Sequence, residues 1–389
     1  MSPTTQPVRY STPPRVKTWP QILIPMNLRG GVLILFALVI GGVGMMMQIS
    51  AAEDLYSDSV QRHGVHLVIA FVVMMMVGSV HIRVWKTMAY PIFIVAIALL
   101  VAVEFFGQTA MGAQRWLSFG PINLQPSELM KVALIMGLAR FLYRYDPEGL
   151  RRFMTVVIPV IMIAVPVFLV AEQPDLGTAV ILCVLGFGLL FASGLRAGFF
   201  IALILIGAMA IPLGWNVLRD YQRERIIAFI NADHDPLGAG YHIAQSKIAF
   251  GAGGFSGRGF GQGTQSHLQF LPEIHTDFIF TMLGEEFGFI GAFSLLIFYV
   301  LGCAFLLYLG VSSCYNQFAR LVAIGVAFNI FLYVSINVAM VSGLIPVVGV
   351  PLPLISYGGT SMIAVLGSLG LVISAVSSPA QREEDGLSF

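Results

Sequence analysis

Charged residues are scarce in this chain. Lys, Arg, Asp and Glu make up 11% of its 389 residues, whereas 57% are hydrophobic, and the mean hydropathy is +0.85. Soluble domains carry about 25% charged residues, so this composition excludes a soluble globular protein. The formal net charge of +1 and the scattered basic residues argue against nucleic acid as a partner. The sequence therefore predicts an all-α polytopic protein surrounded by membrane lipids.

Cysteine is also rare, and residues 1–30 lack the apolar run of a signal peptide because they are polar, proline-bearing and basic. Neither a disulfide framework nor a zinc site is expected, because the three cysteines lie in or beside apolar segments without metal-ligand spacing. These residues are Cys183, Cys303 and Cys314.

Long apolar runs are abundant. A helix needs about 20 mostly apolar residues to cross roughly 30 Å of hydrocarbon, and about ten segments meet this rule. They lie near residues 32–49, 65–80, 90–106, 126–143, 154–171, 178–194, 198–215, 278–308, 320–342 and 360–377. The eighth is too long for one straight crossing, so we expect its first part to tilt or to lie in the interface. We expect one transmembrane domain over 31–377, with tails at 1–30 and 378–389.

Basic residues indicate the orientation. If both termini lie inside, the inner segments hold most of the Lys and Arg, and the short outer loops hold only Arg62 and Arg115. The positive-inside rule then predicts cytoplasmic termini. The large loop 216–277, between the seventh and eighth helices, would face the periplasm and would carry Asp277 at its end.

The stretch Phe270–Phe280 places Glu273, His275 and Asp277 against the start of an apolar segment. Asp277 has two interpretations. It could cap the helix that follows, since Asp is a favoured N-cap residue. Alternatively, a carboxylate with restricted access to water could act as a general base.

Other polar residues lie near the same predicted face. Arg115, beside Trp116, could bind an anion or anchor the chain at the interface. Glu128 and Lys131 are three residues apart and share one face of a predicted span, where they could form a structural salt bridge or line a cavity. Gln173 lies in a turn between two spans and is a candidate for a supporting polar contact.

The large loop has recognisable parts. Residues 241–250 predict a short helix that carries Lys247. The glycine-dense stretch 251–263 contains neither phosphate-binding glycine motif, so it is either a flexible loop or a close backbone approach to a ligand. Further on, residues 343–359 are too apolar for a solvated loop and too rich in Pro and Gly for a helix. We expect them to form the re-entrant wall of a cavity, with Ser356 as a polar contact.

Four stretches, taken together and in order, resemble the SEDS family of bacterial cell-wall proteins (shape, elongation, division and sporulation), over roughly residues 25–377, and are most similar to its elongation branch. They are Gly112–Leu117 with Gln125–Lys131, Gln173–Thr178, Phe270–Phe280, and Pro346–Gly359.

The resemblance implies a glycosyltransferase that polymerises lipid II, an undecaprenyl-diphosphate-linked disaccharide peptide, beside a class B penicillin-binding protein. It places the essential Asp of the family at Asp277, its Glu and Lys pair at Glu128 and Lys131, and its loop Arg at Arg115. Formation of a β-linked chain from an α-linked donor is an inversion, for which one base suffices. Candidates to neutralise the departing diphosphate are Arg115, Lys131, Lys247 or a divalent cation such as Mg²⁺ or Mn²⁺. No cofactor is certain from the sequence, and no metal ligands are identified.

Two alternatives remain open at this point. A lipid II flippase would also need many spans and intramembrane charges, although no inverted repeat is evident and the polar residues gather at one face. A non-catalytic scaffold for the penicillin-binding protein would not need a polar outer cavity.

Overall fold

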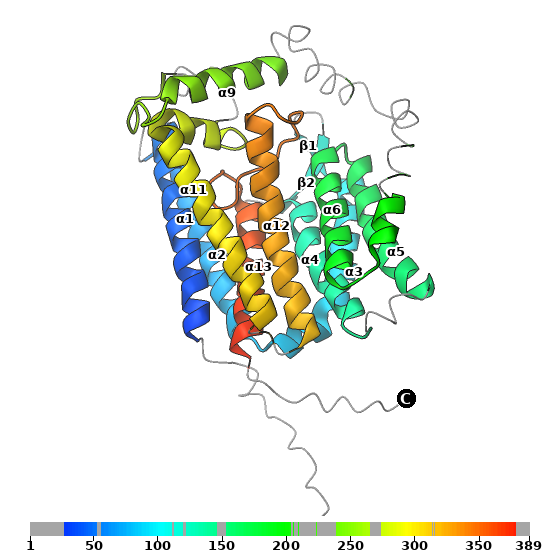
Figure 1. Cartoon of the computed structure of the whole chain (residues 1–389). Coiled ribbons are helices and arrows are strands. Elements are labelled where there is room, and N and C mark those ends of the chain that lie inside the picture. Colours follow the sequence, from blue (N-terminus) through cyan, green and yellow to red (C-terminus); the bar gives the residue numbers. More distant parts are fainter. Residues whose placement is uncertain are drawn as a thin grey trace, which may run out of the picture.

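The computed structural model describes residues 27–52, 56–110, 113–119, 122–145, 153–203, 239–264, 274–312 and 316–378, with a few single residues between them. Long helices lie side by side in a bundle, and one helix, α9, lies across one end of it (Figure 1). The helices are α1 (Leu28–Ala52), α2 (Asp58–Ser79), α3 (Ile82–Phe106), α4 (Pro126–Leu142), α5 (Phe153–Glu172), α6 (Leu176–Ala192), α9 (Ala239–Gly253), α11 (Ile279–Ser312), α12 (Gln317–Val341) and α13 (Gly359–Ser377).

Seven of the described helices are long and apolar enough to cross a membrane, and α6 is a shorter apolar helix. This confirms the predicted polytopic helical fold. Every expected span has a matching helix except the seventh, 198–215, of which the described residues cover little more than the beginning. The predicted helix at 241–250 is part of α9. The three cysteines are free.

The centre of the bundle is formed by α4, α12 and α13. These helices are buried over most of their length, whereas α2 and α3 expose large apolar side chains such as Val72 and Ile94, as helices that face lipid do. Close packing in the centre depends on small residues. At Gly370, where α13 meets α2, a β-carbon would lie 2.6 Å from the carbonyl oxygen of Met74. The central position of α4 explains how it can carry charged residues.

A small antiparallel sheet lies between α3 and α4, and it is an addition to the expected all-α fold. Its strands are β1 (Gln108–Ala110), β2 (Ala113–Phe119) and β3 (Ile122–Leu124), in the order β1-β2-β3. Trp116 of β2 is opposite Gln108, and Leu117 is opposite Leu124. Arg115 of β2 contacts Pro174 and Asp175, directly before α6.

The glycine-dense stretch packs on a break in α11. The break is at Gly288, whose φ of 66° and ψ of −163° are not helical, so the 34-residue helix is not one straight rod. Four backbone hydrogen bonds of 2.9 to 3.1 Å replace the helical bonds lost at the break, and they run in both directions between loop and helix. They are Arg258 N to Glu285 O, Gly259 N to Glu286 O, Phe289 N to Gly254 O, and Ile290 N to Phe255 O.

Glycine is required in this loop. Gly257 has a φ of +80°, and a β-carbon there would lie 2.1 Å from the carbonyl oxygen of Glu286. The close backbone approach is therefore to a helix of the same chain, whereas the sequence predicted either a flexible loop or an approach to a ligand.

The beginning of α1 and the end of α13 lie together, at the end of the bundle opposite α9 (Figure 1). Asn27 donates a hydrogen bond of 2.9 Å from Nδ2 to the carbonyl oxygen of Val376. An even number of crossings would produce this arrangement.

Candidate active site

Asp277 lies in the turn Ile274–Phe278, directly before α11. It is partly buried, and its backbone carbonyl accepts a hydrogen bond of 2.9 Å from Asn337 Nδ2 on α12. Its carboxylate lies against Gly349, where φ is +69° and a β-carbon would be 3.3 Å from Oδ2. Backbone contacts therefore help to set the position of Asp277, and the residue is partly exposed.

The segment that follows α12 holds this turn in place. Ser356 is buried, and its hydroxyl donates to the carbonyl of Thr276 at 2.5 Å and accepts from the amide of Leu352 at 2.7 Å. The amide of Tyr357 donates to the carbonyl of His275 at 2.8 Å. The segment is irregular, as predicted, and it is buried at Val350 and from Leu352 to Ser356, whereas Leu344 is exposed. These contacts pair some of its backbone groups, and its role as the wall of a cavity stays a prediction.

Two buried amide side chains complete the frame. Gln48 of α1 donates from Nε2 to the carbonyls of His275 at 2.8 Å and Ile355 at 3.2 Å, and its Oε1 is 3.3 Å from His275 Nδ1. Asn337 also donates to the carbonyl of Val350 at 2.7 Å. Neither amide was identified from the sequence, although a polar residue inside an apolar span is a recognisable signal.

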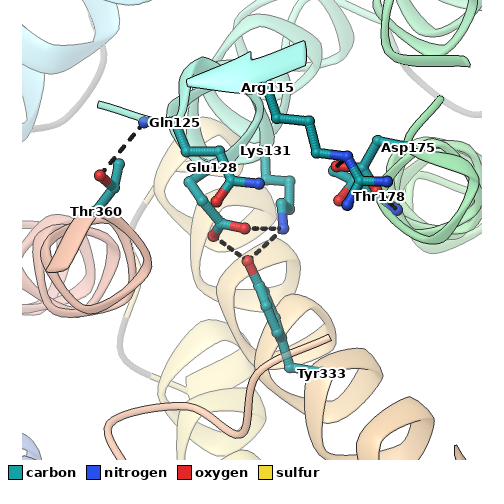
Figure 2. A network of polar contacts seen from close by, with 8 residues as sticks. All are labelled: Arg115, Gln125, Glu128, Lys131, Asp175, Thr178, Tyr333 and Thr360. Carbon is teal, nitrogen blue, oxygen red and sulfur yellow. Dashed lines mark hydrogen bonds and ion pairs between the residues drawn. The ribbon is translucent and has the colours of Figure 1, made fainter. Parts of the chain in front are cut away.

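A second cluster lies inside the bundle and joins α4 to α12 (Figure 2). Lys131 Nζ is 2.8 Å from Glu128 Oε1, and the hydroxyl of Tyr333 forms short hydrogen bonds with both side chains. The Lys131 side chain is 1% exposed and that of Glu128 is 3% exposed. The predicted salt bridge is therefore present within α4, and Tyr333, which the sequence did not single out, extends it to a second helix.

Arg115 lies beside this cluster and joins the sheet to α6 (Figure 2). Its Nε is 3.7 Å from Asp175 Oδ2, and one of its terminal nitrogens donates to the carbonyl of Pro174 at 2.5 Å. The side chain of Arg115 is 23% exposed, so it can contact a ligand while it is paired with Asp175. Gln173 is buried, and its Nε2 donates to the carbonyl of Leu100 at 2.8 Å.

The two clusters are connected through α12 and α13. Tyr333 and Asn337 are four residues apart on α12 and therefore share one face of that helix. At the beginning of α13, the hydroxyl of Thr360 accepts from the amide of Gln125 at 3.3 Å and donates to the carbonyl of Asn123 at 3.0 Å (Figure 2). Both clusters thus lie toward the end of the bundle where α12 ends and α13 begins.

Lys247 lies apart from both clusters. It is exposed on α9, and its side chain covers Gly343 at the end of α12, where a β-carbon would lie 2.6 Å from Lys247 Cε. Glu273 and much of the loop 216–277 lie outside the described residues. Within the described part of the chain, no group of three or more His, Cys, Asp or Glu is placed to hold a metal ion.

Comparison with known proteins decides the family. Residues 30–381 match the FtsW, RodA and SpoVE family, described as cell cycle proteins. This chain belongs to that family. The peptidoglycan glycosyltransferase MrdB of Escherichia coli K12 is 41% identical over 344 residues, which are 88% of this chain and 91% of MrdB. A probable peptidoglycan glycosyltransferase FtsW of Aeromonas salmonicida is 35% identical over 366 residues, or 90% of each chain.

Solved structures of this family have the same fold. A chain from a peptidoglycan synthase complex, in a study of how polymerization and crosslinking are coordinated, superposes with a TM-score of 0.76 at 30% identity, covering 88% of this chain and 96% of that one. The rod shape determining protein RodA of Thermus thermophilus gives a TM-score of 0.67 at 28% identity, covering 88% and 95%. The predicted resemblance to the SEDS family is therefore confirmed, and the chain is a multi-pass membrane protein.

Proposed function

We propose that this chain polymerises lipid II into glycan strands during cell elongation, with Asp277 as the general base. Membership of the family and the names of the relatives make it a peptidoglycan glycosyltransferase, and the identity to MrdB favours the elongation role. The observation that carries the assignment of the base is the position of Asp277. Asp277 is partly exposed, in a turn that α1, α12 and the segment after α12 hold by its backbone.

The reaction needs one base. The hydroxyl of the acceptor sugar attacks the anomeric carbon of the donor, a new carbon–oxygen bond forms, and the bond to the diphosphate oxygen breaks. The proton of the hydroxyl passes to the Asp277 carboxylate, and the electron pair of the broken bond leaves with the diphosphate. A single displacement inverts an α-linked donor into a β-linked product and needs no second carboxylate as nucleophile. Glu128 is poorly suited to be the base because it is buried and paired with Lys131.

Charge on the departing diphosphate needs positive compensation. Arg115 and Lys247 are both at least partly exposed, whereas Lys131 is enclosed with Glu128 and Tyr333. Arg115 is therefore the stronger candidate near the bundle, and Lys247 is the candidate on α9. A divalent cation could share this task, and removal of Mg²⁺ and Mn²⁺ with EDTA during polymerisation tests it.

The proposed orientation follows from the charge bias of the loops, with both termini in the cytoplasm and Asp277 toward the periplasm. No nucleoside triphosphate is expected on that side, so the lipid-linked diphosphate must supply the energy of polymerisation. We also propose a class B penicillin-binding protein as partner. The similarity to a chain of a peptidoglycan synthase complex that couples polymerization to crosslinking supports this partner.

The test is polymerisation of lipid II by purified protein in detergent. We expect glycan from the wild type and none from Asp277→Asn, which removes the base and keeps the shape. Asp58→Asn is the matched control because its carboxylate is exposed at the start of α2 and pairs only loosely with Arg62 at 3.9 Å. A flippase would make no glycan in detergent, where no membrane separates two compartments. A non-catalytic scaffold would make none either. Full polymerisation by Asp277→Asn would remove Asp277 from the role of base.

A further inference from the structure

The N-terminus of α13 lacks a cap. Its N-cap residue is Gly358, which offers no side chain, and the first bond of the helix runs from the amide of Met362 to the carbonyl of Gly358 at 3.0 Å. Among the described residues, none accepts a hydrogen bond from the amides of Gly359, Thr360 or Ser361. Such an end carries partial positive charge and attracts anions.

Two histidines of α2 lie at this end without partners. The rings of His63 and His66 are 6.3 and 6.2 Å from the ring of Tyr357, which is two residues before α13. His66 covers Gly359, where a β-carbon would lie 2.9 Å from its Nε2. His63 is fully buried, and neither of its ring nitrogens has a partner among the described residues, nor does Nδ1 of His66. Buried nitrogens without partners are costly, so they point to a ligand with acceptor oxygens.

This end of α13 lies between the two clusters of the site. On one side, the amide of Tyr357 donates to His275 in the Asp277 turn. On the other side, Thr360 accepts a hydrogen bond of 3.3 Å from the amide of Gln125, which is the N-cap residue of α4, the helix that carries Glu128 and Lys131. An anion bound here would therefore be next to the reaction centre.

An apolar groove leads away from the histidines along α1 and α2. It measures about 540 Å³ and is lined by apolar side chains alone, among them Leu38, Leu67, Phe71 and Val72. Leu67 directly follows His66 in the sequence, so the groove begins where the polar end of α2 stops. A ligand that fits both parts has an anionic head and a long apolar chain.

We infer that the N-terminus of α13, with His66 and His63, binds the diphosphate of an isoprenyl diphosphate whose chain lies in the groove of α1 and α2. This inference rests on the proposed function and adds the place where the donor or the departing lipid diphosphate is held. The helix end and the imidazole N–H groups donate to the phosphate oxygens. The groove takes the chain because both are apolar.

The experiment measures binding of farnesyl diphosphate to the purified full chain in detergent. Binding of farnesol and of inorganic pyrophosphate is measured separately, because these compounds carry the apolar chain and the diphosphate of the probe, respectively. We expect His66→Ala to weaken farnesyl diphosphate about tenfold, equivalent to about 1.4 kcal/mol. His66→Asn should retain most of the affinity because its amide nitrogen replaces Nδ1. Val72→Trp, which fills the groove, should weaken farnesyl diphosphate and leave pyrophosphate unchanged.

Gln61→Ala is the matched control, since Gln61 is exposed on the same end of α2 and bonds the carbonyl of Tyr56. Thermal unfolding checks that each variant is folded. With lipid II, His66→Ala should raise KM more than it lowers kcat. Unchanged farnesyl diphosphate affinity in folded His66→Ala and Val72→Trp would overturn the inference.

A separate variant distinguishes failure of this inference from failure of the proposed function. Asp277→Asn should bind farnesyl diphosphate as tightly as the wild type and yet make no glycan. If His66→Ala changes neither binding nor KM while glycan synthesis by the wild type is normal, the inferred diphosphate site is wrong and the proposed polymerase function stands. Binding that depends on His66, in a chain that makes no glycan, keeps the site and removes the polymerase.

Discussion

Two acidic regions of this bundle differ in how their carboxylates are held. Glu128 is buried on α4, with its oxygens paired to Lys131 and Tyr333. Asp277 lies in a turn whose carbonyls bond Asn337 and neighbouring side chains, and it keeps partial exposure. The oxygens of Glu128 are used in pairing, whereas the turn that holds Asp277 is supported through its backbone carbonyls. We therefore propose a structural role for the first region and the catalytic role for the second.

The largest expected effect on stability comes from Lys131→Met. This change leaves the Glu128 carboxylate buried beside Tyr333 without its cation, which costs about 3–5 kcal/mol when a buried pair is broken. Thermal unfolding in detergent should show a clear loss of stability. Asp277→Asn, which we expect to abolish activity, should unfold near the wild-type temperature.

The double variant Glu128→Gln with Lys131→Met sharpens this prediction. Removing both charges leaves no buried ion, so the double variant should be more stable than Lys131→Met alone. A double variant that is less stable than the single one would contradict the assignment of the pair as a structural element.

Asn337→Leu should affect both regions of the comparison. It removes the donor to the carbonyls of Asp277 and Val350 and should cost about 2–3 kcal/mol, as expected for buried groups left without partners. Because the turn then loses one support, kcat should fall about tenfold, since small displacements of a catalytic group slow a reaction. Asn329→Leu is the control. It is a buried asparagine two turns earlier on α12, and it should leave kcat unchanged.

Ser356→Ala should give the smallest effect. It removes the bond to the carbonyl of Thr276 and the acceptor for the amide of Leu352, at about 1–2 kcal/mol. A few-fold loss of kcat in the lipid II assay is expected. Ser368→Ala is the control because its buried hydroxyl bonds only the carbonyl of Val365 on its own helix. Equal losses of kcat in both variants would show that the support of the turn does not matter.

The sequence predicted the features that depend on local pattern. Apolar runs located the helices, and the spacing of Glu128 and Lys131 predicted a shared face. Asp277 was predicted as the base from its position at the start of an apolar segment and from the family motif, and its role stays a prediction. The irregular backbone of segment 343–359 followed from its Pro and Gly content.

Features that depend on contacts between distant segments were not predicted. The bond from Asn337 to Asp277 joins residues 60 positions apart, and the contact of Tyr333 with Glu128 joins residues 205 apart. The sheet at 108–124 is made of strands too short for a clear alternation of side chains. Glycine density predicted a flexible loop or a ligand contact at 251–263. The actual partner, a broken helix, was not predicted, because no local signal in the sequence identifies it.

The main-chain bonds between this loop and α11 have a mechanical consequence. They join loop and helix as neighbouring strands are joined, without relying on side chains. The loop and the first turns of α11 must therefore shift as one body, with Gly288 at its lower edge. A force on the exposed Phe255 would pass along that body to Ile279, two residues from Asp277, the proposed base.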